Sequence, residues 1–165
     1  MFDLIVISNA WVHLMAAVLV IGGSFTLNFI VTKKLGILSP PEAGKLSQVV
    51  GKTFGQLAWI MSGLLILTGV ARMIGLKLFS SQVLLETTYG NLLLAKLVLF
   101  AIIIINMVLI AGTGMKLEKL GVDGPPPADQ LKAGGMRIKT LGMTNLMLSS
   151  IIVALAVSMR VLGAP

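Results

Sequence analysis

Four long apolar stretches divide this 165-residue chain, and polar residues gather between them. The stretches cover residues 4–31, 54–75, 91–114 and 141–162. An α-helix rises ~1.5 Å per residue, so each stretch is long enough to cross the ~30 Å hydrocarbon core of a bilayer. The pattern predicts an all-α fold: one domain, residues 1–165, forming a four-helix antiparallel transmembrane bundle.

Turn and helix-breaking residues mark the two basic connections. Between the first and second stretches, the run from Ser39 to Glu42 with its two prolines predicts a turn followed by a helix start. The residues after it are compatible with a short amphipathic helix at the membrane interface. Between the third and fourth stretches, a triple proline and the Gly134-Gly135 pair predict a loop with helical ends. Neither connection is long enough for a catalytic domain.

The composition places the chain in a membrane. Hydrophobic residues make up 56% of it and charged residues 12%, whereas a soluble domain has roughly 25% charged residues. The lipid bilayer is therefore its first partner. A formal net charge of +7 would suggest nucleic acid as the partner of a soluble protein. Here the basic residues are grouped by connection, and we expect no nucleic-acid binding.

The distribution of Lys and Arg predicts the orientation. The first and third connections carry Lys33, Lys34, Lys45, Lys52, Lys116, Lys119, Lys132, Arg137 and Lys139, and the opposite side carries only Arg72, Lys77 and Arg160. Basic residues concentrate on the cytoplasmic side of membrane proteins. We therefore expect a multi-pass protein of the plasma membrane, with the first and third connections cytoplasmic and the N and C termini outside.

His13 is the one histidine of the chain, and it lies in an apolar stretch that carries no formal charge from Val6 to Val31. Ionisable residues inside a membrane are costly, and they commonly mark functional sites. A neutral imidazole could simply bond two helices together. The functional alternative is a ligand for copper or for haem iron, because imidazole suits both metals.

Lys96 lies near the start of the third stretch and His13 near the start of the first, at a similar depth, so the two residues could share a layer. Tyr89 falls on the same helical face as Lys96. Lys96 could snorkel to the nearby surface. Alternatively, Lys96 and Tyr89 could form a polar gate or an anion contact.

Methionine is abundant, with ten residues. Thioether sulfur is a soft ligand that selects Cu(I), although methionine also fills apolar cores. With the expected orientation, Met15, Met73 and Met159 lie in the outer half of the membrane. They are candidate metal co-ligands of His13. Gly22, Gly23, Gly63 and Gly69 would permit close helix approach.

The sequence lacks the residue patterns of several other kinds of functional site. The chain has no cysteine, no Ser-His-acid set, no phosphate-binding glycine loop and no carboxylate within an apolar stretch. We expect no enzymatic activity of its own. Haem b held between two histidines of one chain is excluded, so haem would need His13 together with Met, Lys or a partner subunit.

Two segments resemble the copper resistance D (CopD-like) family of membrane proteins. In the segment from Thr87 to Leu109 the matching residues are Thr87, Tyr89, Gly90, Leu93, Leu94 and Lys96. In the segment from Trp11 to Leu27 they are His13, Gly22 and Gly23, an arrangement that is also similar to a related haem-handling group of small membrane oxidases. The resemblance implies copper transport or copper loading, with an outward-facing histidine and lysine.

Two other functions stay open. Members of that family are commonly longer or fused to a periplasmic copper-binding domain, whereas this chain has short connections and no exposed cluster of His or Met. It could therefore be a small accessory subunit of a larger, copper-dependent membrane enzyme, with protein partners or further copies of itself. The third function is that of a haem-binding redox subunit.

Overall fold

The computed structural model describes residues 2–35, 37–75, 81–120 and 127–162, and nearly all of them are helical. The first long helix consists of α1 (Phe2–Phe25), a π-helical segment η1 (Thr26–Val31) and α2 (Thr32–Leu35). The other three are α3 (Pro40–Gly75), α5 (Thr88–Leu120) and α6 (Ala128–Leu162). A short helix, α4 (Ser81–Glu86), precedes α5. Each long helix is apolar enough to cross a membrane, which confirms the predicted all-α, four-span fold.

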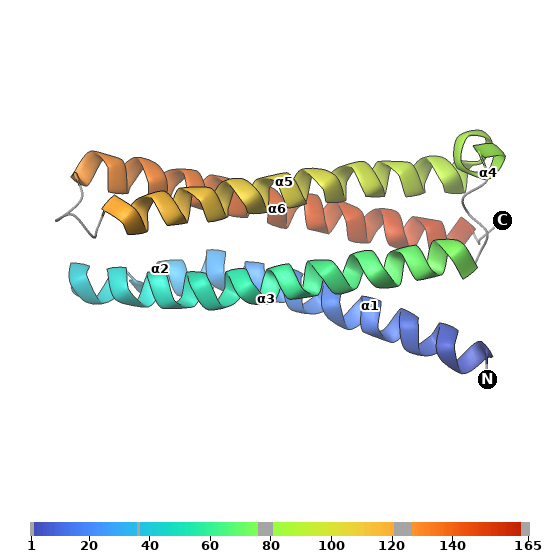
Figure 1. Ribbon diagram of the computed structural model, residues 1–165, viewed down its shortest axis with the longest axis horizontal. Helices are drawn as coiled ribbons and strands as arrows, with labels where there is room; N and C mark the ends of the chain where they lie inside the picture. Colours follow the sequence, from blue (N-terminus) through green and yellow to red (C-terminus); the bar gives the residue numbers. More distant parts are fainter. Residues whose placement is uncertain (1, 36, 76–80, 121–126, 163–165) are drawn as a thin grey trace.

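The four long helices form two antiparallel pairs. Figure 1 shows the first long helix beside α3, and α5 beside α6. The pairs meet where α1 and η1 contact α6. The start of α1 and the end of α6 lie together at what we call the terminal end (Figure 1). The start of α3, the end of α5 and the start of α6 lie at the opposite end, which we call the loop end.

Helix α3 begins much earlier than the second apolar stretch. The expected short interfacial helix is wrong, because those residues form the first turns of α3, which runs without interruption from Pro40 to Gly75. The Glu42 side chain caps its start: the backbone N–H and the hydroxyl of Ser39 both donate to the Glu42 carboxylate, the former at 3.2 Å. The helix then continues past Lys45 and Lys52 into the apolar span.

The glycine pair in the third connection does not interrupt α6. The predicted helical ends of this connection are present, but a loop at the glycine pair is wrong, since α6 starts at Ala128 and runs straight through Gly134 and Gly135. A Cβ on Gly134 would lie 2.9 Å from the side chain of Leu117, so this glycine permits close packing of α5 and α6. Pro125 and Pro126 lie outside the described residues.

The π-helical segment in the first span was not predicted. Both the backbone N–H and the Oγ1 of Thr32 bond to the carbonyl of Leu27, five residues earlier. Such a segment inserts one extra residue into the helix and shifts the faces on either side of it. The π-helical segment η1 also contacts α6.

One of the glycines of the first span sets the distance between α1 and α3. A Cβ on Gly23 would overlap the ring of Phe54, while one on Gly22 would meet no atom within 4 Å. The two neighbours therefore have different roles. Gly23 lets α1 approach α3, whereas Gly22 lies on an open face.

Candidate polar site in the bundle interior

Polar residues make up much of the interior. The buried side chains of the described residues comprise the apolar Ala16, Ala58, Leu93, Ile103, Leu146 and Met159, and the polar Ser62, Thr68, Asn106, Asn145 and Ser149. In a bilayer, polar side chains gain nothing by facing lipid and collect between helices. The interior of this bundle is therefore a column of polar groups rather than a purely apolar core.

His13 joins α1 to α3 near the terminal end of this column. Its Nδ1 lies 2.7 Å from the Oγ1 of Thr68, and its Cε1 lies beside Gly69. One turn earlier on α1, the Asn9 amide donates to the backbone carbonyl of Thr68 at 3.0 Å. Two polar side chains of α1 thus contact a single residue of α3.

The hydroxyl of Thr68 determines how this imidazole is protonated. Its Oγ1 lies 2.6 Å from the carbonyl oxygen of Leu64. A carbonyl only accepts, so the single hydroxyl proton is directed to Leu64. The bond to the imidazole then requires Nδ1–H as the donor and Thr68 Oγ1 as the acceptor. The neutral ring consequently keeps its free lone pair on Nε2, the atom that can bind a metal.

Two positive side chains influence His13 electrostatically. They are Lys96 of α5 and Arg72 of α3, and Arg72 also influences Lys96. Lys96 is half-buried. A shared depth of His13 and Lys96 stays a prediction. A layer of this charge favours an anion over a free cation.

Three of the other candidate residues, Met73, Tyr89 and Met159, pack together. Their cluster lies closer to the terminal end than His13, and its α3 member is one turn beyond the contact with His13. Met159 of α6 and Leu93 of α5 form a buried pair, and Met73 and Tyr89 pack against it. Met73 lies four residues after Gly69, hence on the same face of α3 and one turn beyond His13. The structure thus stacks two thioethers and a phenol directly above the His13 layer.

Met15 does not join this group. It is 45% exposed, and it follows His13 by two residues, which corresponds to about 200° around a helix. Its thioether therefore leaves the helix on the side opposite His13.

Below the His13 layer the column continues toward the loop end. Ser62 of α3 donates to the sulfur of Met107 of α5 at 3.6 Å. The Asn106 amide donates to the Asn145 side-chain oxygen at 2.9 Å, which joins α5 to α6. Gly142 of α6 lies next to the Asn28 side chain of η1. Side chains of every long helix thus contribute to the column.

Two members of this column were not predicted from the sequence. Thr68 and Ser62 were not among the candidate residues, because serine and threonine in an apolar stretch resemble ordinary packing residues. Only the rotation of α3 about its axis identifies Thr68 and Ser62 as inward-facing. Among the described residues, no group of three or more His, Cys, Asp or Glu side chains could hold a metal ion.

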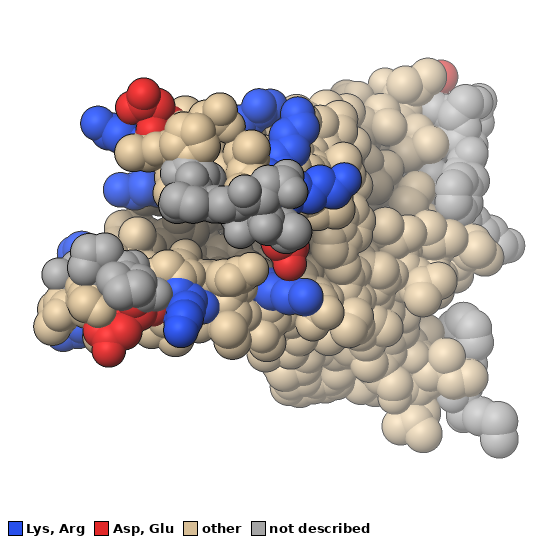
Figure 2. Space-filling model, turned by 60° about the vertical axis from the view of Figure 1, so that its left-hand side comes forward, with Lys and Arg blue, Asp and Glu red and all other residues tan. Residues whose placement is uncertain are grey.

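Basic residues are concentrated at one end of the molecule. Figure 2 shows Lys and Arg side chains gathered at the loop end, whereas the sides of the bundle in this view are free of them. The basic residues of the first and third connections therefore lie together, as expected for connections on one side of a membrane.

An all-helical bundle with four apolar spans and a polar interior is an integral membrane protein of the multi-pass class. The family described as copper resistance protein D (CopD) matches residues 48–159. The chain belongs to this family. The matched region includes the segment from Thr87 to Leu109 that carried the resemblance in the sequence, while the segment from Trp11 to Leu27 lies before it. No curated protein and no solved structure matches the chain.

Proposed function

We propose that this protein handles copper in the membrane, by transport or by loading of a partner, with Cu(I) as its cargo and without catalysing a reaction. Membership of the copper resistance protein D family supports copper as the cargo. The observation that carries the proposal is the contact between His13 and Thr68, because an Nδ1–H that donates to Thr68 would leave the Nε2 lone pair of His13 free for a metal. An imidazole held in this way by a second residue is typical of metal ligands.

The thioethers of Met73 and Met159 are the soft ligands nearest in layer to His13. A cargo ion entering at the terminal end would meet these two sulfurs first and His13 next. Met107 would offer a third sulfur deeper in the column, beside Ser62. In this proposal Met15 has no role, because it faces away.

Lys96 would act as the gate of this route. Its charge and that of Arg72 oppose an unaccompanied cation in the His13 layer, so that copper passes only when ligands neutralise or shield it. Tyr89 lies two turns before Lys96 on α5, in the cluster with Met159. This arrangement supports a polar gate, as proposed from the sequence.

The test is the copper content of the chain purified in mild detergent after loading with Cu(I). We expect about one copper per chain for the natural sequence and a loss of most of it for His13→Leu. Met15→Leu is the matched control and should keep its copper. Equal copper content in the natural protein and in His13→Leu would refute the ligand role of His13.

A second candidate is an accessory subunit of a larger membrane complex. The observation that favours it is Gln56, whose side chain is exposed near the start of the apolar stretch of α3. An exposed amide there could bond to a polar group of a neighbouring protein. Purification in mild detergent distinguishes the two: a stable partner that is lost in Gln56→Leu supports the subunit, and a Soret absorption band would instead identify a haem protein.

The proposed orientation has the loop end in the cytoplasm and both termini outside, in the plasma membrane. The grouping of Lys and Arg at the loop end supports it (Figure 2).

A further inference from the structure

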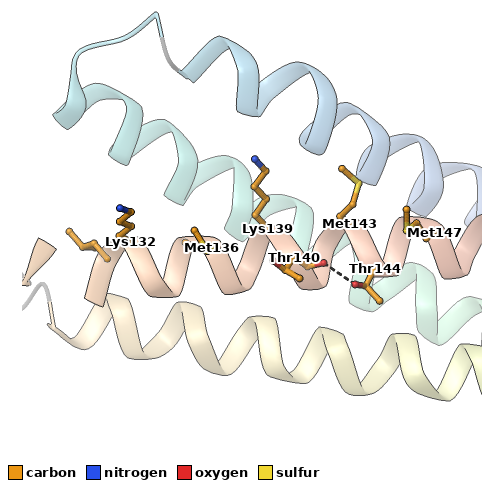
Figure 3. Close-up of a pocket in the computed structure, with 9 residues that line it drawn as sticks. Lys132, Met136, Lys139, Thr140, Met143, Thr144 and Met147 are labelled. Atoms are coloured by element: carbon orange, nitrogen blue, oxygen red, sulfur yellow. Dashed lines mark hydrogen bonds between the residues drawn. The ribbon is translucent and has the colours of Figure 1, made fainter. Parts of the chain in front are cut away.

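The first half of α6 bears an open groove that the proposed copper route does not use. Its volume is about 640 Å³, and it is lined by Leu131, Lys132, Gly135, Met136, Lys139, Thr140, Met143, Thr144 and Met147. All of these residues belong to α6, at the spacing of one helical face. Figure 3 shows Lys132, Met136, Lys139, Met143 and Met147 projecting from the same side of the helix.

The chemistry of the groove changes along its length. Lys132 and Lys139 lie toward the loop end, and the methionines Met143 and Met147 lie deeper. Lys139 immediately precedes the apolar stretch that begins at residue 141, so it marks the depth at which the bilayer interface meets the helix. From Lys139 to Met147 the helix rises ~12 Å, close to the ~15 Å of hydrocarbon in one leaflet.

This order of groups matches one kind of molecule. We propose that the groove binds an anionic phospholipid, with its phosphate between Lys132 and Lys139 and an acyl chain along Met143 and Met147. Lysines at the membrane interface attract anionic headgroups. Flexible methionine side chains adapt to an acyl chain, as they do to other irregular apolar surfaces.

Two features of this face of α6 favour a lipid, rather than another helix, as its occupant. Met136 and Met147 are 62% and 65% exposed, so no element of the described chain covers them. Gly135 adds no side chain, and a Cβ placed there would meet no atom within 4 Å. The described part of the chain therefore leaves the hollow open along its length.

One hydroxyl within the groove is already bonded inside its own helix. Thr144 donates its hydroxyl proton to the carbonyl of Thr140 at 3.0 Å, within α6 itself. The lysines are thus the groups that distinguish an anionic headgroup from a zwitterionic one. Each contributes about a fivefold preference, and together they give about 30-fold.

The test is native mass spectrometry of the full chain in mild detergent, after addition of equal amounts of phosphatidylglycerol and phosphatidylcholine. We expect the natural protein to retain phosphatidylglycerol in preference. The variant Lys132→Gln/Lys139→Gln should bind it about 30-fold more weakly. The control Lys116→Gln/Lys119→Gln removes the same charge from the same end of the bundle and should change binding by less than twofold.

A second variant tests the groove without changing its charge. Gly135→Leu fills the hollow in open space and should reduce phosphatidylglycerol retention at least fivefold, while Gly51→Leu on α3, also in open space, should not. Equal retention of the two lipids by the natural protein would overturn the proposal. So would an equal loss in the two double-lysine variants, unchanged retention in Gly135→Leu, or a dimer of this chain that excludes the lipid.

Discussion

Asn106 of α5 donates a hydrogen bond to the side-chain oxygen of Asn145 of α6 at 2.9 Å, and both residues are buried. This bond joins the two helices of one pair in a region where lipid surrounds them. Bonds of this type stabilise membrane proteins by about 0.6–2 kcal/mol, because the separated helices also find partners for their amides.

We expect Asn106→Ala and Asn145→Ala each to lower the free energy of unfolding, since each leaves the other amide without its partner. The double variant should cost less than the sum of the two, with a coupling of about 0.6–2 kcal/mol. Unfolding in mixed detergent micelles measures it. Thr113→Val and Thr144→Val, whose hydroxyls bond only within their own helices, form the control pair and should be additive.

The two neighbouring glycines of α1 give a second prediction. Gly23→Ala should destabilise the protein by about 1–3 kcal/mol, because the new methyl group overlaps the ring of Phe54 and forces α1 away from α3. Gly22→Ala places the same methyl group in open space, where alanine also favours the helix. Thermal unfolding compares the two variants directly. Equal stability would show that the Phe54 ring moves aside freely.

The Thr68 hydroxyl should determine the tautomer of His13. Because the chain contains a single histidine, its ¹⁵N spectrum gives one imidazole to assign. We expect the Nδ1–H form in the natural protein and in Thr68→Ser, and loss of this preference in Thr68→Val. If copper binds at Nε2, Thr68→Val should also weaken Cu(I) about 10–100-fold, as measured by competition with a chelator.

The control for that experiment is Thr113→Val, which removes a hydroxyl with the same type of bond to the preceding turn, at 2.8 Å, but with no histidine beside it. Its spectrum and copper affinity should equal those of the natural protein. An Nε2–H form in the natural protein would contradict the assignment of the Thr68 proton to Leu64.

The orientation in the membrane can be tested by labelling, because the chain has no cysteine of its own. Ile37 is 75% exposed at the loop end, and Glu86 is exposed at the end of α4. A maleimide that cannot cross membranes should label Glu86→Cys in intact cells and should label Ile37→Cys only after lysis. The reverse pattern would place the loop end outside.

The sequence predicted how deep a residue lies along its helix better than the direction in which its side chain points. His13 and Lys96 could be placed in one layer because each residue along a helix adds a fixed rise, which needs no knowledge of the partner helix. Thr68 could not be predicted as the partner of His13, since that depends on how α3 is rotated about its axis. Met15 was a candidate ligand for the same reason: its depth was right, but its side chain points away.

The residues at which helices begin and end were predicted less accurately than the positions of the apolar spans. Hydropathy marks only the residues that need lipid, so it placed the start of the second span at residue 54, whereas α3 starts at Pro40, where the Glu42 carboxylate accepts from Ser39. The Gly134-Gly135 pair suggested a break, yet α6 continues through it with Gly134 close to Leu117. The π-helical segment leaves no comparable signal, because it depends on a single inserted residue.

The continuity of these helices also determines how far the molecule reaches. Helix α3 has 36 residues and α6 has 35, so each is ~50 Å long and exceeds the ~30 Å hydrocarbon layer by ~20 Å. The charged part of that excess lies at the loop end, around Lys45 of α3 and Arg137 of α6. The spanning helices themselves therefore carry basic side chains past the hydrocarbon layer, on a surface that is already helical before any partner binds.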